Sequence, residues 1–155
     1  MKPKIILGTD HAGFELKEEV KKYLQNQGYK VRDKGAFKLD KNDDYPDFIY
    51  AAAKEVSENS DSKGIIFGGS GQGEAIVANK IKGIRAIVFN CGNLDIIKSS
   101  RTHNDSNILS IGARFVSKEA AFKAIRLWLE TGFSNEPRHQ RRLKKISDLE
   151  KRLCK

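Results

Sequence analysis

Short β-branched segments alternate with helical patterns along the whole 155-residue chain, and this alternation restricts the fold more than any other feature. Such an order is typical of a parallel sheet covered by helices on both faces. We therefore predict an α/β fold with a five-stranded parallel sheet. The expected strands are Ile5–Leu7, Lys30–Arg32, Gly64–Phe67, Ile84–Phe89 and Ile108–Ile111.

Each expected strand is followed by a helical pattern. In the first, Leu16, Val20 and Leu24 are spaced four apart, and Gly28 ends the predicted helix 14–27. Further helices are expected after residue 46, near residues 74 and 94, and over 117–130. A sixth, amphipathic and basic pattern over 137–155 predicts an extra C-terminal helix beyond the sheet. Without an internal repeat or a long linker, residues 1–155 are expected to form one domain.

Composition narrows the class of protein. The hydrophobic content is 39%, yet no apolar run reaches the length of a membrane span, and the N-terminus is too short for a signal peptide, so we expect a soluble, cytoplasmic protein. Two cysteines, Cys91 and Cys154, have no metal-ligand spacing and are expected to be free thiols. The net charge of +9 points to an anionic partner such as a phosphorylated metabolite or nucleic acid, although spread basic residues are commonly a solvated surface.

Polar segments follow the expected strands at the carboxyl ends, where parallel sheets bind ligands. Asp10 and His11 follow the first strand, and residues 68–74 (Gly-Gly-Ser-Gly-Gln-Gly-Glu) follow the third. His103 and Asn104 come near the end of the fourth helix. We expect these three segments to gather at one edge of the sheet.

The glycine-rich segment has the character of an anion-binding loop that opens a helix, since glycines let the backbone aim several N–H groups at one anion. It is neither a P-loop nor a good dinucleotide fingerprint, and a plain glycine turn stays an alternative. Glu74 lies in the first helical turn, where the helix dipole alone favours a carboxylate. In a dry pocket Glu74 can instead act as a general base, with the loop amides stabilising an enediolate.

Histidines and arginines supply the remaining candidates. All three histidines, His11, His103 and His139, have polar or charged neighbours in the sequence. Arg138 and Arg142 are four residues apart and share one helical face, so they can clamp one phosphate, although a solvated basic face is the alternative.

The chain resembles the family of type B ribose-5-phosphate isomerases, which also includes galactose-6-phosphate isomerase subunits. Seven motifs in order carry the resemblance: Gly8 to Phe14, Asp44 to Asp47, Gly69 to Gly73 with Ala78 to Lys80, Gly83 to Ala86, His103 to Asp105 with Asn107, Gly112 to Arg114, and Arg138 to Arg142.

The resemblance implies a Rossmann-like αβα sandwich, a homodimer or tetramer with active sites shared between subunits, and a C-terminal helix, 137–155, at the subunit interface. It implies that Asp10 and His11 contact the sugar phosphate and that His103 is the acid that opens the furanose ring. The residues expected to hold the reacting end of the substrate are Gly69, Ser70, Gly71, Gln72 and Gly73. The residues expected to hydrogen-bond the substrate or bind its phosphate are Asn104, Arg114, Arg138 and Arg142.

One departure concerns the base. Many members of the family have a cysteine base immediately before the glycine loop, where this chain has Gly68. Another branch uses a glutamate directly after the loop, and Glu74 matches that pattern. Glu74 is therefore expected to move a proton between C2 and C1 through an enediolate, with Ser70 helping to move the hydroxyl proton.

Ribose 5-phosphate and ribulose 5-phosphate are the expected substrate pair, and neither a metal nor a cofactor is expected. An isomerase of the same family that acts on allose 6-phosphate or galactose 6-phosphate is the nearest alternative. A nucleic-acid-binding module that uses residues 138–155 is a remote one, because this tail has no aromatic residue for stacking on bases. A flavin or nucleotide binder is allowed by the fold alone.

Overall fold

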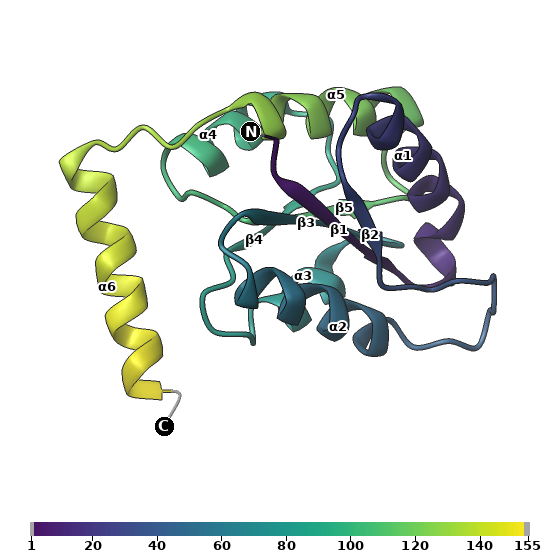
Figure 1. Ribbon diagram of the computed structural model, residues 1–155, viewed down its shortest axis with the longest axis horizontal. Helices are drawn as coiled ribbons and strands as arrows, with labels where there is room; N and C mark the ends of the chain where they lie inside the picture. The colour runs from purple at the N-terminus through teal and green to yellow at the C-terminus, as the bar shows by residue number, and fades with distance from the viewer. Residues whose placement is uncertain (1, 154–155) are drawn as a thin grey trace.

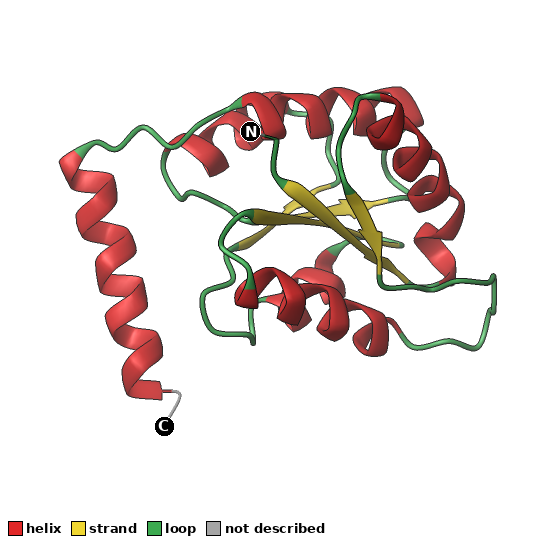
Figure 2. Ribbon diagram, in the orientation of Figure 1, coloured by secondary structure: helices red, strands yellow, loops and turns green. Residues whose placement is uncertain are grey.

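The computed structural model describes residues 2–153, which form a parallel five-stranded sheet between two layers of helices (Figures 1 and 2). The strand order is β2-β1-β3-β5-β4, and every neighbouring pair is parallel. The strands are β1 (Lys4–Thr9), β2 (Val31–Asp33), β3 (Ser62–Gly68), β4 (Ala86–Phe89) and β5 (Ile108–Gly112). The predicted α/β sandwich is confirmed.

The helices have the predicted places between and after the strands. Their bounds are α1 (Phe14–Asn26), α2 (Tyr45–Glu58), α3 (Gln72–Ala78), α4 (Leu94–Thr102), α5 (Lys118–Glu130) and α6 (Pro137–Leu153), and a short 3-10 helix, η1 (His11–Gly13), precedes α1. In Figure 1, α1, α4 and α5 cover one face of the sheet, while α2 and α3 cover the other.

The alternation of side chains along each strand creates the two halves of the core. Ile5 and Leu7 of β1 pack with α1, α4 and α5, in a cluster that includes Trp128 of α5. Ile6, between them, faces the opposite way and packs with α2 and α3. Both faces of the sheet are therefore buried, as expected for parallel strands.

The fourth strand is shorter than the predicted Ile84–Phe89. Gly83 has a positive φ of 82°, and the N–H of Ile84 donates to the carbonyl of Ile81 in a turn, while the N–H of Arg85 donates to the side chain of Asn107, so the first two predicted residues lie outside the strand. Ile84 is nevertheless 4% exposed and packs in the α2–α3 half of the core. Ile84 is therefore a core residue that lies in a turn and not in a strand.

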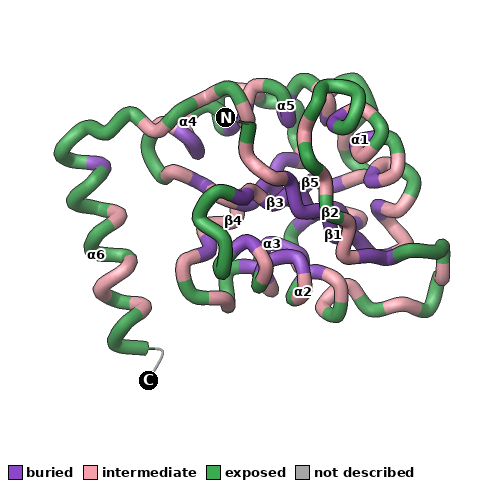
Figure 3. Tube along the Cα trace, in the orientation of Figure 1, coloured by how far each residue is buried: buried purple, intermediate pink, exposed green. Residues whose placement is uncertain are grey.

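Helix α6 stands apart from the sandwich in Figure 1, and Figure 3 shows most of it exposed. Its apolar residues Ile146, Leu149 and Leu153 are 43%, 51% and 82% exposed. Among the described residues, the carboxylate of Glu150 accepts the N–H of Gly83, and the ring of His139 packs on His103. This helix therefore buries little of its apolar stripe within its own chain.

Over residues 2–153 no helix is long and apolar enough to cross a membrane. Cys91 is an exposed free thiol, as predicted. The prediction for Cys154 lies outside the described residues, as does the end of the predicted helix 137–155.

Candidate functional site in two halves

The predicted site residues form two groups at opposite edges of the sheet. Asp10, the glycine loop, Glu74 and Arg114 follow the carboxyl ends of β1, β3 and β5. His103 and Asn104 follow α4, which runs back along the sheet, so they lie beside the amino ends of β4 and β5. The expectation that all three segments gather at one edge is wrong within a single chain, because a helix that connects parallel strands ends at the edge opposite to its start.

Glu74 is the central residue of the carboxyl-edge group. It is 4% exposed, and burial, with a smaller contribution from the negative charge of Asp10, raises the pKa of its carboxyl above the usual range, against an opposing backbone hydrogen bond. A raised pKa brings a carboxylate closer to the strength that a base needs to remove a proton from carbon at neutral pH.

Gly68 makes room for this carboxylate. A Cβ added at position 68 would overlap the carboxylate oxygens of Glu74. The side chain of Glu74 therefore occupies the volume in which a side chain of the preceding strand would otherwise stand. The predicted link between Gly68 and Glu74 has a direct steric basis.

Hydrogen bonds from three neighbouring segments hold the glycine loop in place. The carbonyl of Gly69 accepts the N–H of Arg114 at 3.0 Å, and the carbonyl of Ser70 accepts the side-chain amide of Asn90 at 3.1 Å. Ser110 donates its hydroxyl to the carbonyl of Gly71 at 2.7 Å. Gly71 needs to be glycine, because its φ is +79° and a Cβ would lie 3.1 Å from the backbone nitrogen of Gly112. The loop is thus a rigid element beside Glu74.

Two further loop residues, Gln72 and Gly73, begin α3. Gln72 is exposed, whereas Gly73 packs against Tyr45, whose ring would lie 2.8 Å from an added Cβ. The hydroxyl of Ser70 accepts the N–H of Gln72 at 3.3 Å, so this side chain helps to shape the loop.

Asp10 and His11 stand next to this loop, Asp10 as the N-cap of η1 and His11 as its first residue. One carboxylate oxygen of Asp10 accepts the N–H of Ala12 at 2.9 Å and so caps η1. The ring Nδ1 of His11 lies 2.7 Å from Oδ1 of Asp43, which also accepts the backbone N–H of His11 at 3.0 Å. Sequence reasoning missed Asp43; the only signal for it was a pair of adjacent acids, Asp43 and Asp44, just before an expected helix.

Asp10, His11 and Asp43 also form a group with the composition of a metal site, since their ligand atoms lie within 4.8 Å of one another. However, the Nδ1 and backbone nitrogen of His11 share one oxygen of Asp43 at hydrogen-bond distances. We therefore assign this group to hydrogen bonding.

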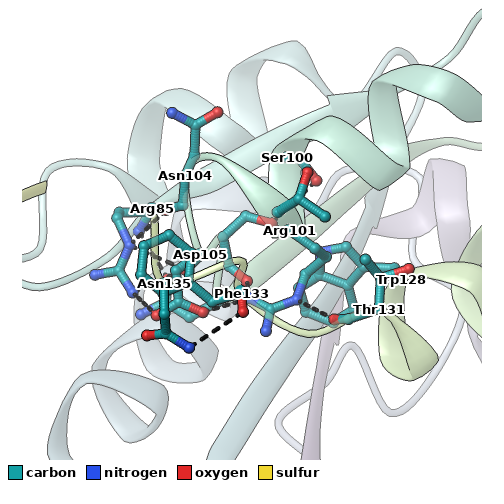
Figure 4. Close-up of polar contacts among 12 residues, drawn as sticks. Arg85, Ser100, Arg101, Asn104, Asp105, Trp128, Thr131, Phe133 and Asn135 are labelled. Carbon is teal, nitrogen blue, oxygen red and sulfur yellow. Dashed lines mark hydrogen bonds and ion pairs between the residues drawn. The ribbon is translucent and has the colours of Figure 1, made fainter. Parts of the chain in front are cut away.

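The amino-edge group is built on the turn between α4 and β5, shown in Figure 4. Arg85 donates to the backbone carbonyls of Asn104 and Asp105 at 3.0 Å each. The carboxylate of Asp105 bridges Arg85, at 3.1 Å, and Arg101, at 2.7 Å. Arg101 also donates to the carbonyls of Ser106 and Thr131. Arg101 of α4 and Arg85, just before β4, thereby fix the segment that carries His103 and Asn104, whose own side chains remain exposed.

His103 packs on His139, the one buried residue among those described in α6. The ring centroids are 4.4 Å apart, and the Nδ1 of His139 lies 2.8 Å from the hydroxyl of Ser134. Burial lowers the pKa of His139, and the positive charges of His103, Arg138 and Arg142 lower it further, although Glu136 opposes them. A lowered pKa disfavours a second positive charge beside His103. Arg138 and Arg142 are exposed, and together these residues form a basic group.

The first group therefore brings a buried carboxylate, a glycine loop and a histidine together, while the second offers an exposed histidine, an amide and two arginines. The first has the groups for moving a proton, and the second has those for binding an anion.

Comparisons with known proteins agree on one family. The model of the family described as Ribose/Galactose Isomerase matches residues 5–146. The chain is 38% identical to ribose-5-phosphate isomerase B of Mycolicibacterium paratuberculosis, with 96% of this chain and 92% of the relative covered. It is also 38% identical to the Escherichia coli protein of the same name, with 96% and 97% covered.

Solved structures give the same result. Ribose-5-phosphate isomerase B of Clostridium thermocellum has a TM-score of 0.91 at 40% identity, covering 97% of this chain and 99% of that one. The Mycoplasma genitalium enzyme with bound ribulose-5-phosphate has a TM-score of 0.90 at 36% identity, covering 96% of each chain. With the family model, full-length relatives and the sheet order in agreement, this chain belongs to the ribose/galactose isomerase family.

Proposed function

We propose that this protein interconverts ribose 5-phosphate and ribulose 5-phosphate by moving one proton between C2 and C1, in the cytoplasm and as part of the pentose phosphate pathway. The family membership and the ribulose-5-phosphate bound in the Mycoplasma genitalium neighbour support this substrate pair. The observation that carries the chemistry is the buried Glu74 carboxylate with a raised pKa beside a rigid glycine loop.

Glu74 takes the proton from C2 of the open-chain aldose, and the electrons move to give an enediolate. Backbone N–H groups of residues 69–73 stabilise the negative oxygen, because they are held in place before the charge develops. The carboxylate returns the proton to C1, and the Ser70 hydroxyl helps to move the hydroxyl proton. Asp10 and His11 contact the sugar phosphate from the neighbouring η1. This sequence needs neither a metal nor a cofactor.

A second copy of the chain completes the site. His103 of that copy opens the furanose ring as an acid and Asn104 hydrogen-bonds the substrate, while its Arg138 and Arg142, with Arg114 of the first copy, bind the phosphate. The separation of the two groups within one chain supports this arrangement, because a substrate cannot contact both edges of a sheet. The exposed apolar stripe of α6 also supports an oligomer, since Leu149 and Leu153 are 51% and 82% exposed among the described residues. A dimer or a tetramer satisfies this requirement.

An isomerase for a six-carbon phosphate is the second candidate, because the family description names galactose beside ribose. The proton transfer is the same for both sugars, so the relative turnover on each decides between them. Binding of nucleic acid through the basic tail is not part of the proposal, because the arginines of α6 are assigned to phosphate capture.

Interconversion of the two pentose phosphates by the purified protein, with Glu74→Gln beside the wild type, tests the proposal. Loss of the base should lower kcat by about a thousandfold while the fold stays intact, because the amide has nearly the same shape but accepts no proton. Addition of EDTA should leave the wild-type rate unchanged.

Allose 6-phosphate and galactose 6-phosphate serve as the comparison substrates. Turnover of these alone would replace the five-carbon assignment by the six-carbon one. A Glu74→Gln variant with wild-type kcat would show that another group is the base.

A further inference from the structure

Asp43 is a largely buried carboxylate for which the proposed reaction has no role. It lies at the end of the loop 34–44, just before α2, and its side chain is 9% exposed. Its Oδ2 is buried without a hydrogen-bond partner among the described residues. A buried carboxylate oxygen without a hydrogen bond costs free energy in a protein interior. The contacts of the other oxygen therefore have to explain why a carboxylate is present here.

That other oxygen, Oδ1, contacts His11 twice. It accepts the backbone N–H at 3.0 Å and lies 2.7 Å from the ring Nδ1. Because an ionised carboxylate only accepts hydrogen bonds, Nδ1 must carry a proton in this contact. The nitrogen that remains for an external partner is then Nε2.

The side chain of His11 is 28% exposed, so part of its ring reaches solvent while Nδ1 faces the protein. The other carboxylate beside it, Asp10, is 3.9 Å from Nδ1 and uses an oxygen to cap η1. Asp43 therefore makes the shorter contact and determines the direction of the ring.

The loop that carries Asp43 is held at both ends. At its start, the buried ammonium of Lys17 donates to the carbonyl of Ala36 at 2.7 Å and to both oxygens of Asp33. At its end, Asp43 is held to His11 and its N–H donates to the carbonyl of Asp40. A carboxylate on a loop held in this way can hold a histidine ring in one orientation.

We infer that Asp43 is a positioning residue for His11: it holds the ring in the form that carries the proton on Nδ1 and presents Nε2 to the sugar phosphate. This inference rests on the proposed role of His11 in substrate binding. Asp43 itself does not touch the substrate; it acts through the histidine.

Asp43→Asn tests the inference, since asparagine keeps the shape and an oxygen acceptor but can also turn its NH₂ group toward Nδ1. Nitrogen-15 NMR of the histidine rings at pH 8 reports which ring nitrogen is protonated. With three histidines in the chain, His11→Gln identifies the signals of His11. We expect a protonated Nδ1 in the wild type and a new population protonated on Nε2 alone in Asp43→Asn.

Asp44→Asn is the matched control. It removes the same charge one residue away, from an exposed side chain that makes no capping hydrogen bond. This variant should leave the ring signals and the kinetics unchanged. A wild-type His11 without a proton on Nδ1 would overturn the inference, whatever the enzyme acts on.

Kinetics supply the second readout. Asp43→Asn should raise KM for ribose 5-phosphate by about tenfold and change kcat less than about threefold, as expected for one weakened contact to a charged ligand. In a His11→Gln background the same substitution should have no further effect on KM. Equal effects in both backgrounds would mean that Asp43 only supports the loop. Because the NMR result does not depend on turnover, failure of the proposed substrate assignment is distinguishable from failure of this inference.

Discussion

At the scale of single residues, two carboxylates share the carboxyl edge but have different surroundings. Glu74 is buried without a cationic partner among the described residues, whereas Asp10 accepts a backbone N–H as the cap of η1. The negative charge of Asp10 adds to the effect of burial and raises the pKa of Glu74. In the proposed reaction Glu74 must lose its proton to act as a base, so its pKa is expected to set the acid side of the pH profile.

Asp10→Asn should therefore shift the acid limb of the kcat/KM profile to lower pH. Removal of a neighbouring negative charge makes ionisation of Glu74 easier and lowers its pKa. The maximum of the profile should fall by about tenfold as well, because Asp10 also contacts the sugar in the proposed site. A steady-state profile from pH 4 to 8 measures both effects.

Glu119→Gln, which removes an exposed acid of α5, controls for the change in net charge and should leave the limb in place. A limb that stays fixed in Asp10→Asn would show that a group other than Glu74 produces it.

Sequence reasoning named Glu74 and His11 but not Asp43, and the reason is physical. Position in the chain identifies residues that follow a strand, because topology places the strand ends together. Asp43 reaches His11 from 32 residues away through the path of an irregular loop. No periodicity encodes such a path.

At the scale of elements, the turn between α4 and β5 holds most of the amino-edge group. Asp105 has a positive φ of 43°, a conformation that Asp and Asn adopt more readily than other non-glycine residues, and its carboxylate joins two arginines. This turn also supplies the backbone carbonyls that Arg85 binds (Figure 4). The orientation of His103 and Asn104 therefore depends on a residue that need not contact the substrate.

Asp105→Ala should destabilise the protein by about 2 kcal/mol, because it combines backbone strain with the loss of a partner for the buried Arg101. Asp105→Asn should lose less stability, because asparagine tolerates the same φ. Urea denaturation of the two variants measures the difference. Equal losses would show that the charge contacts account for the whole effect and the backbone conformation for none.

The elements themselves were the most predictable feature. All five strands and all six longer helices lie where the alternating patterns place them, since burial on both faces of a sheet leaves a strong hydrophobic signal. The short η1 was missed, because it begins directly after β1 and merges with the pattern of α1. The start of β4 was wrongly predicted at Ile84, because a hydrophobic turn residue that packs in the core gives the same hydrophobic pattern as a strand residue.

At the scale of the whole molecule, the carboxyl-edge and amino-edge groups lie at opposite edges of one sheet, and in the proposed function each group is half of a site. The sequence pattern and the family resemblance named the residues of both groups, but the expectation that they gather at one edge ignored the direction of α4. The position of a helix end follows from topology, whereas its pairing with a second chain does not follow from patterns along one chain.

Mixed oligomers should reveal shared sites. Glu74→Gln and His103→Ala should each be inactive alone, but a mixed dimer contains one site with both substitutions and one with neither. Unfolding and refolding an equal mixture should restore about a quarter of the wild-type activity, since about half of the dimers are mixed and each has one intact site.

A mixture of Glu74→Gln with Glu74→Asn is the control, and it should stay inactive because every site lacks the base. The absence of any recovery in mixtures confirmed to contain both chains would show that Glu74 and His103 do not act on one substrate across a dimer.

Gly68 also restricts how a lineage can exchange its catalytic base. A side chain at position 68 and the carboxylate of Glu74 compete for one volume. Under the proposed role of Glu74, a chain that gained a side chain at position 68 while it kept Glu74 would have to move the carboxylate, and a chain that lost Glu74 first would have no base. The two positions are therefore expected to change together along evolutionary branches.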